Sequence, residues 1–316
     1  MKQKLKIALQ MDPLEKLDLS GDTTFILGLE AIRRGFEVFF YTPSDLIYRD
    51  NLIYAKAKIL NLAFKNGKEI FSYGKEKVLK LSSFDVVLMR QDPPFDMNFI
   101  NNTYVLEAAE NKGLKVVNRP SSLRTFNEKL SILNYPSFIT DTVVTSKKSL
   151  MEEFINIHKR VVLKPLGLMG GNGVQIVNTD NCSEVLNSMP FDNSEMLMLQ
   201  KFIDDVYLGD RRILIINGNL PESVVLRKPP EGDFRGNLAI GGTASTETLN
   251  ERDKEIASII AKDLLKQGIF IAGLDVVGGF LTEINITCPT CFRELLDQTG
   301  ENLAASFVDQ LEIIKI

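Results

Sequence analysis

Histidine, cysteine and long apolar runs are scarce in this chain of 316 residues. The one histidine, His158, lies at the polar end of a predicted helix, and a single imidazole disfavours His-based zinc chemistry and a Ser-His-Asp triad. Three cysteines are too few for a disulfide framework. No apolar run approaches the roughly 20 residues of a membrane-spanning helix. These shortages exclude disulfide-stabilised secreted domains and membrane-spanning proteins.

The first residues of the chain are too polar for a signal peptide. Their apolar run from Leu5 is cut by Gln10 and closed by Asp12, so we expect a first strand there. The formal charge of −4, with 25% charged residues, provides no basic patch for nucleic acid and no polybasic membrane segment. We therefore expect a cytoplasmic protein that binds neither nucleic acid nor membranes.

The length predicts two or three domains, which we place at 1–124, 125–199 and 200–316. In the first unit, alternating strands and helices predict a parallel sheet. No G-x-G-x-x-G follows the first strand, which disfavours a Rossmann cofactor site. The expected elements of this unit are strands 5–11, 36–41, 86–89 and 115–118, helices 23–34 and 97–112, hairpins within 46–81 and a turn at 119–122.

Arg90 and Asp92 directly follow the predicted strand 86–89, and two prolines stiffen the loop that carries them. Open α/β sheets bind ligands at the carboxyl ends of their strands, so both side chains are candidates for substrate contacts. An Arg–Asp pair on the surface explains the same residues equally well.

The central unit contains a glycine-rich loop, 164–173, between predicted strands. Its four glycines permit the positive-φ backbone that closes amide N–H groups over phosphate oxygens. The Lys-Ser/Thr of a Walker loop is missing; Lys164 instead precedes the loop, where it can reach a phosphate. A plain hairpin loop explains the glycines about as well. The expected elements here are strands 142–145, 161–164 and 174–177 and helices 147–158 and 182–189.

The third unit contains a long segment, 227–243, in which glycine, proline and charge combine without helical or strand period. Such a loop in a compact domain is either a functional lid or disordered. A helix then begins after Asn250, with Asp253 at the capping-box position, and ends near Gly268. The other expected elements are strands 196–202, 209–216 and 223–226, a hairpin over 271–286 and a final helix, 303–314.

The hairpin over 271–286 turns at Gly278-Gly279 and carries a candidate metal site. Glu283 and Asn285 share one face of its second strand, because side chains alternate. Asp275 joins them only if a three-residue loop or a glycine bulge shifts the register, and we predict that odd loop. Two carboxylates and an amide oxygen suit Mg²⁺. A solvated strand face with chance acids explains this stretch equally well.

Cys288-Pro289-Thr290-Cys291 matches C-x-x-C, a pattern of some redox proteins. It follows the candidate metal strand directly, and no second pair completes a zinc site. We favour a loop that lines the active site over a redox centre.

These features occur in one order: a lysine, a second lysine with the glycine loop, a connecting strand, arginines with a lid and an acidic hairpin. That order resembles the ATP-grasp enzymes, which hold ATP between two α+β lobes and join a carboxylate to an amine through an acyl phosphate. From end to end the chain resembles the prokaryotic glutathione synthetases. The resemblance rests on Met89–Asp96, Asn127–Lys129, Leu163–Leu166, Met169–Gly171, Arg235–Ala239 and Gly273–Thr287, of which the last two together are specific.

The resemblance implies an α/β chain with an ATP-grasp fold behind an N-terminal parallel-sheet domain. It further implies a ligase that joins γ-glutamylcysteine and glycine into glutathione, with ATP as co-substrate, Mg²⁺ or Mn²⁺ as cofactor, and a homotetramer. It assigns catalysis to Lys164, Arg212 and Arg235, and the metal to Asp275, Glu283 and Asn285. Nucleotide contacts would come from Lys129, Lys164, Gly167, Gly170, Gly171, Gln200, Lys201, Phe202, Ile203, Asp210 and Arg227.

The chain departs from the family pattern at Ile240, Thr243 and Cys288, where the family often has Ala, Arg and Ser. The first two leave the lid contacts open, and the third leaves the redox hypothesis open. The residues leave three other functions open. The first is another ATP-grasp ligase, of the D-alanine or glutamate type; the second is an ATP-binding regulatory module without turnover; the third is a dithiol redox protein. Paired lysines, acids and a lid favour a ligase, because a simple binder needs no groups that serve a transition state.

Overall fold

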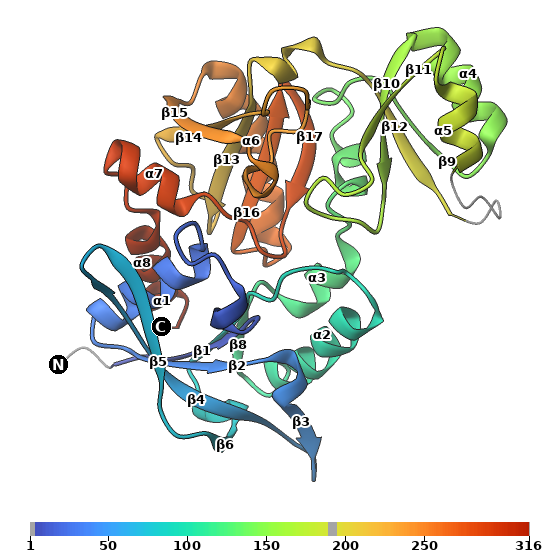
Figure 1. The fold of residues 1–316 in the computed structure, drawn as a ribbon. Coiled ribbons are helices and arrows are strands. Elements are labelled where there is room, and N and C mark those ends of the chain that lie inside the picture. The colour runs from blue at the N-terminus through green and yellow to red at the C-terminus, as the bar shows by residue number, and fades with distance from the viewer. Residues whose placement is uncertain (1–3, 189–194, 316) are drawn as a thin grey trace.

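The N-terminal part of the molecule is built on an eight-stranded sheet (Figure 1). The structure is a computed structural model that describes residues 4–188 and 195–315. The main path of the sheet runs β3-β4-β2-β1-β7-β8, and β5 and β6 pair with β4. Its strands are β1 (Lys6–Gln10), β2 (Glu37–Tyr41), β3 (Leu46–Arg49), β4 (Leu52–Lys65), β5 (Lys68–Tyr73), β6 (Lys77–Lys80), β7 (Val86–Met89) and β8 (Lys115–Val117).

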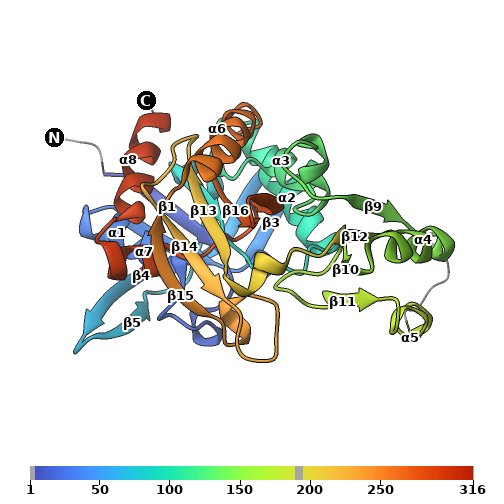
Figure 2. The ribbon, with the colours of Figure 1, turned by 90° about the horizontal axis from the view of Figure 1, so that it is seen from above.

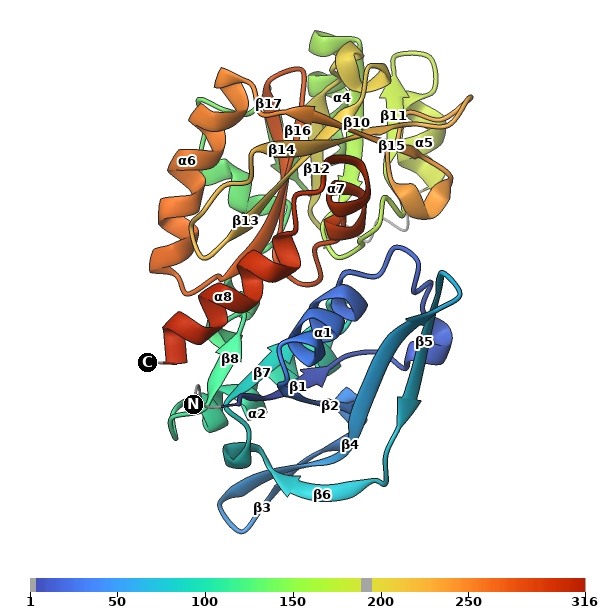
Figure 3. The same cartoon turned by 90° about the vertical axis from the view of Figure 1, so that its left-hand side faces the viewer.

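Within this sheet, β2, β1, β7 and β8 are parallel, as the βαβ pattern predicted. Strands β3, β5 and β6 each pair with β4 in the antiparallel direction. The helices of this part are α1 (Thr23–Arg33), α2 (Met97–Glu110) and α3 (Pro120–Thr125). The turn predicted at 119–122 is wrong: a short helix begins at Pro120, whose fixed φ suits the first helical position. Figure 3 shows α1 between this sheet and the C-terminal helix.

The central sheet is antiparallel, in the order β11-β10-β12-β9. Helix α4 buries Met151 and Ile155 in the small core beside it. The predicted boundary at 199/200 falls inside β12, a middle strand of this sheet, so we place the boundary after Lys201. Met189, the predicted end of the second helix, lies outside the described residues. The elements are β9 (Thr142–Thr145), β10 (Arg160–Pro165), β11 (Gln175–Asn178), β12 (Leu197–Lys201), α4 (Lys148–His158) and α5 (Cys182–Ser188).

The C-terminal sheet has the order β15-β14-β13-β16-β17, each neighbour antiparallel. The predicted capping box at Asn250 and Asp253 is present at the start of α6. Two elements were not predicted: β15, whose Thr-rich sequence is short of apolar residues, and α7. The elements are β13 (Asp210–Ile216), β14 (Ser223–Lys228), β15 (Thr243–Thr248), β16 (Ile271–Val277), β17 (Phe280–Asn285), α6 (Glu251–Lys266), α7 (Phe292–Thr299) and α8 (Leu303–Lys315).

The end of the chain returns to its beginning. Helix α8 lies beside α1, and Arg34 donates to Asp309 and to the carbonyl of Ala305 (3.0 Å) (Figure 1). One apolar core joins Leu9 and Phe25 to Phe292 and Phe307. In Figure 2 the central sheet with α4 and α5 extends to one side of this joined body. The C-terminal sheet is therefore anchored to the N-terminal domain, while the central sheet has a small core of its own and joins the larger core through Met198.

Candidate active site

The β16–β17 hairpin brings its three polar side chains together by a bulge. Gly278 and Gly279, both with positive φ (55° and 79°), form a two-residue turn, with Val277 opposite Phe280. The register shifts next to Asp275, so that Thr282 is the extra residue and Asp275 lies opposite Glu283. The shared face is thus as predicted, but the predicted odd loop or glycine bulge is wrong: the extra residue is a threonine, whose hydroxyl donates to the Asp275 carbonyl (3.1 Å).

Asp275 is buried and held by two arginines. Arg212 donates to both carboxylate oxygens (Nε to Oδ1 2.5 Å, Nη2 to Oδ2 2.9 Å), and Arg227 Nη2 lies 2.9 Å from Oδ1. Burial raises the pKa of Asp275, but the two guanidinium groups outweigh burial and lower that pKa to about 2. Asn285 Nδ2 donates to Asp275 Oδ2 (3.0 Å), the oxygen that also accepts from Arg212 Nη2. Asp275 is therefore ionised and fixed in position.

A second, largely buried carboxylate, Asp210 of β13, pairs with Arg227 of the neighbouring strand β14. Burial raises the pKa of Asp210, while Arg227 acts in the opposite direction. Two arginines and two aspartates thus form one compact buried cluster behind the hairpin face.

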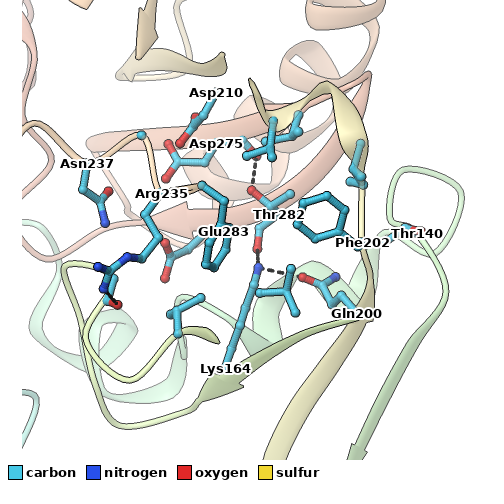
Figure 4. A pocket seen from close by; sticks show the side chains of 18 of the residues that line it. Thr140, Lys164, Gln200, Phe202, Asp210, Arg235, Asn237, Asp275, Thr282 and Glu283 are labelled. Carbon is cyan, nitrogen blue, oxygen red and sulfur yellow. Dashed lines mark hydrogen bonds between the residues drawn. The ribbon is translucent and has the colours of Figure 1, made fainter. Parts of the chain in front are cut away.

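Two lysines from the central part of the chain face Glu283. Lys129 Nζ lies 3.2 Å from Glu283 Oε1 and also donates to the carbonyl of Leu168 in the glycine loop. Lys164 Nζ donates to Gln200 Oε1 (2.7 Å) and to the Thr282 carbonyl (3.2 Å) (Figure 4). Burial lowers the pKa of Lys164, and the charge of Glu283 opposes that effect. The lysines and the acids therefore share one site, although more than 100 residues separate them in sequence.

A cavity of about 830 Å³ lies between the central and C-terminal sheets, and Figure 4 shows its wall. Apolar side chains of Val162, Val174, Val206 and Val277 contribute to its lining. Of the sequence-predicted residues, it is lined by Lys129, Lys164, Gly171, Gln200, Lys201, Phe202, Ile203, Asp210, Arg235, Asp275 and Glu283.

A second cavity, of about 1360 Å³, adjoins the first at Gly171, Asn237 and Glu283. Its walls come from the glycine loop, the loop at Asp92 and the segment Thr287–Cys291. The remaining predicted site residues line this cavity: Gly167, Gly170, Arg212, Arg227 and Asn285.

Arg90 lies behind the wall of the second cavity. It is almost fully buried and donates from Nε to Thr24 Oγ1 (3.1 Å) and from Nη2 to the Pro289 carbonyl (2.9 Å). Cys288 Sγ in turn lies 3.3 Å from the Arg90 carbonyl. Arg90 therefore supports the 287–291 loop, which is a different task from the substrate contact that its position after β7 suggested.

The lid segment meets the glycine loop through one arginine. Arg235 Nη1 donates to the Gly171 carbonyl (3.0 Å), and its other nitrogens bind Asp233 in the same segment. Its side chain is 29% exposed, whereas that of Arg212 is 6% exposed. The predicted bounds of the lid segment, 227–243, are wrong at both ends, because β14 extends to Lys228 and β15 begins at Thr243; the lid segment is therefore 229–242. It contains the short 3-10 helix Leu238–Ile240 and is otherwise without regular structure.

The three cysteines are free, and burial raises the pKa of both Cys288 and Cys291. A raised pKa disfavours the reactive thiolate, which weighs against the redox hypothesis. Over residues 4–188 and 195–315, no group of three or more His, Cys, Asp or Glu side chains is placed to hold a metal ion. A metal at the hairpin would therefore need the amide oxygen of Asn285 beside the two carboxylates. In the same ranges, no helix is both long and apolar enough to cross a membrane.

Sequence reasoning assigned no role to several residues of the site. Asn237 contacts both cavities, Thr282 closes the bulge, and Glu128 lines the second cavity. All three residues occur in motifs of the resemblance, 127–129, 235–239 and 273–287, but no residue pattern marked Thr282 as the extra residue of a bulge.

Known proteins resemble the chain over nearly its whole length. A family model described as "Prokaryotic glutathione synthetase, N-terminal domain" matches residues 5–124, and one described as "Prokaryotic glutathione synthetase, ATP-grasp domain" matches residues 128–300. The glutathione synthetase of Coxiella burnetii is 40% identical over 310 residues, covering 98% of this chain and 96% of the relative. That of Nitrosomonas europaea is 39% identical over 312 residues, covering 98% of each.

Solved structures share the fold at low sequence identity. D-cycloserine synthetase DcsG superposes with a TM-score of 0.68 at 13% identity, over 98% of this chain and 100% of the other. D-alanyl-alanine synthetase A from Vibrio cholerae has a TM-score of 0.61 at 15% identity, over 100% and 99%. The predicted ATP-grasp fold is confirmed. With two family models and relatives near 40% identity, this chain belongs to the prokaryotic glutathione synthetase family.

Proposed function

We propose that this chain joins γ-glutamylcysteine to glycine, releasing ADP and phosphate, through an acyl-phosphate intermediate. Its family makes it an ATP-dependent ligase that forms glutathione. The observation that carries the mechanism is the meeting of Lys129 and Lys164 with the Asp275–Glu283 face at one cavity. Cations on one wall and oxygen ligands on the other suit a triphosphate held between them.

We place the adenine at the strand end 200–203, where the apolar wall of the first cavity suits a flat ring. Lys129 and Lys164 then bind the phosphates as point charges, and the positive-φ backbone at Gly170 and Gly171 lies next to them. Lys164 is aimed by Gln200 and the Thr282 carbonyl, so its position does not depend on the nucleotide.

Asp275, Glu283 and Asn285 would hold Mg²⁺ or Mn²⁺. The donor set fits a hard cation, because all three offer oxygen, Asp275 is ionised, and Glu283 is a quarter exposed toward the cavity. Such an ion supplies neutralisation of phosphate charge when it is bound. Two protein carboxylates leave the remaining ligand positions to phosphate oxygens and water.

Arg212 and Arg235 would stabilise charge on the phosphoryl group as it passes to the cysteinyl carboxylate of γ-glutamylcysteine. Arg212 is preorganised by its two hydrogen bonds to Asp275. Arg235 is carried by the lid, which excludes water from the acyl phosphate until the amine of glycine attacks. No side-chain nucleophile is required, consistent with the buried, high-pKa thiols of Cys288 and Cys291.

The peptide substrate would occupy the second cavity, against Asp92 and the Thr287–Cys291 loop. The cytoplasmic location stays a prediction from the composition, and the homotetramer stays a prediction from the resemblance. Gel filtration with light scattering measures the subunit number directly.

The test is incubation of the protein with ATP, Mg²⁺, γ-glutamylcysteine and glycine, leaving out each component in turn. We expect phosphate and glutathione to form in equal amounts and only in the complete mixture. Replacing the peptide and glycine by D-alanine, or by glutamate as the added amino acid, separates the other ligase classes. Phosphate release with D-alanine but not with γ-glutamylcysteine would reject the proposed substrates.

A further inference from the structure

The chain passes directly from the candidate metal strand into the wall of the second cavity. Asn285 ends β17, and Ile286 and Thr287 lead into the 287–291 loop. Any shift of the Ile286 peptide therefore moves a candidate metal ligand on one side and a substrate-facing loop on the other.

Glu128 holds this connection from one side. Its Oε1 accepts hydrogen bonds from the amides of Ile286 (2.6 Å) and Thr287 (2.9 Å) and from Thr287 Oγ1 (3.0 Å). Its own carbonyl accepts from the Ile284 amide (3.0 Å), so the segment before Lys129 runs along β17 as a further support. Glu128 is buried, with only 3% of its surface exposed.

Asn118, from the N-terminal domain, holds the connection from the other side. Its Nδ2 donates to the carbonyls of Ile286 (2.7 Å) and Ile271 (2.8 Å), and its Oδ1 accepts from the amides of Phe270 (2.7 Å) and Ile271 (2.9 Å). One buried amide thus binds the beginning of β16 and the end of β17 at once. It fixes the open end of the hairpin, opposite the Gly278-Gly279 turn.

We propose that Glu128 and Asn118 are positioning residues of the ligase reaction. They clamp the backbone at Ile286 from two sides and thereby orient Asn285 toward the metal and Thr287 toward the second cavity. This inference rests on the proposed function of the hairpin as the metal site. Outer partners of this kind orient the groups that touch the metal, and their loss typically costs about 10- to 100-fold in metal affinity or activity.

Reach and charge are separable at Glu128. A glutamine keeps the length and a carbonyl oxygen that accepts the same three hydrogen bonds, but it has no charge. An aspartate keeps the charge but is one methylene shorter, so its oxygen no longer reaches both amides. A clamp requires reach, whereas a group that binds or deprotonates the glycine ammonium requires charge.

The experiment compares Glu128→Gln, Glu128→Asp and Glu128→Ala in the full chain. Mn²⁺ binding is measured by electron paramagnetic resonance with a non-hydrolysable ATP analogue, and kcat and KM for each substrate in the complete reaction. For the Asp and Ala variants we expect Mn²⁺ affinity and kcat to fall by about 10- to 100-fold, with KM for ATP nearly unchanged. The Gln variant stays within about threefold of the parent in both, by the same reasoning.

Glu30 supplies the matched control. It is also buried, accepts three hydrogen bonds of 2.8 Å from Arg33 and Arg34, and lines a separate cavity between α1 and α7. Glu30→Ala should lower the melting temperature while leaving Mn²⁺ affinity and kcat at parent values. Asn118→Asp tests the other half of the clamp, because a carboxylate still accepts from the amides of Phe270 and Ile271 but repels the carbonyls of Ile271 and Ile286.

Three results would overturn the clamp: parent-like Mn²⁺ affinity and kcat in Glu128→Asp, a Gln variant as impaired as Ala, or an Asn118→Asp variant with unchanged Mn²⁺ affinity. The second of these would assign Glu128 to the glycine ammonium instead. A parent protein that makes no glutathione would reject the proposed function separately, because Mn²⁺ binding does not depend on turnover.

Discussion

The β16–β17 hairpin and the lid segment 229–242 both bring charged groups to the same cavities, but they hold these groups differently. Asp275 of the hairpin is buried, and it is bound by three side chains from other strands: Arg212, Arg227 and Asn285. Arg235 of the lid is bound mainly by Asp233, two residues away, and by one carbonyl of the glycine loop. A side chain that is hydrogen-bonded to several strands keeps its position, whereas a side chain bonded mainly within its own loop can move with that loop.

The strongest test of this difference is Asp275→Asn. It leaves Arg212 and Arg227 buried beside a neutral group, and breaking a buried ion pair costs about 3–5 kcal/mol. We expect a clearly lower free energy of unfolding, by urea titration, together with loss of nearly all activity. Asp233→Asn is the control at the lid, where a partly exposed local pair contributes at most about 1 kcal/mol. Equal destabilisation by both substitutions would show that the hairpin and the lid hold their charged side chains equally firmly.

Glu283→Gln tests whether the hairpin face serves the metal rather than the fold. Glu283 is a quarter exposed but its partner Lys129 is buried, so the neutral variant should lower the melting temperature, though by less than Asp275→Asn, in which both partners are buried. An amide is a weaker ligand for a hard cation than a carboxylate, so we expect activity to fall by at least about 100-fold and to require more Mg²⁺. Superimposable Mg²⁺ titration curves for variant and parent would contradict the ligand assignment.

Arg235→Ala tests whether the lid segment contributes to catalysis. A charge that acts only after closure affects the transition state more than the bound nucleotide, so kcat should fall by about 100-fold while the Kd of ATP changes little. Stopped-flow and equilibrium binding measurements separate the two. The lid proposal fails if turnover is unchanged, or if the loss lies entirely in ATP affinity.

The smallest expected effect concerns the contact between the lid and the glycine loop. Gly171 has a φ of 77°, and a Cβ there would collide with the Asn237 amide of the lid. Gly171→Ala therefore costs about 1 kcal/mol of local strain, and we expect roughly a fivefold lower kcat. Gly21→Ala is the control outside the site, since its φ is not positive and a Cβ there would have no atom of the described residues within 4 Å beyond its chain neighbours. Equal kcat values for the two variants would show that the contact does not matter for closure.

Local patterns explain which parts of the fold were predictable. Strand β7 and the helix cap at Asn250 follow from alternation, turn residues and side-chain capping, all within a few residues. Strand β15 and helix α7 were not predicted. Strand β15 is poor in apolar residues, and α7 is short and follows a proline-containing loop. The shared face of Asp275 and Glu283 was predicted, but its cause was not, because a bulge at Thr282 has no marker such as glycine.

From the residues alone we could predict the order of the elements, the two lysines before the acidic hairpin, and the motifs of the family. Tertiary structure alone decided that Arg212 and Arg227 converge on Asp275, that Lys129 lies against Glu283, and that Asn118 and Glu128 meet at Ile286. Turns and caps are governed by neighbours in the chain, whereas these pairings depend on strand order and on burial, which bring together groups separated by 48 to 168 residues in one low-dielectric site.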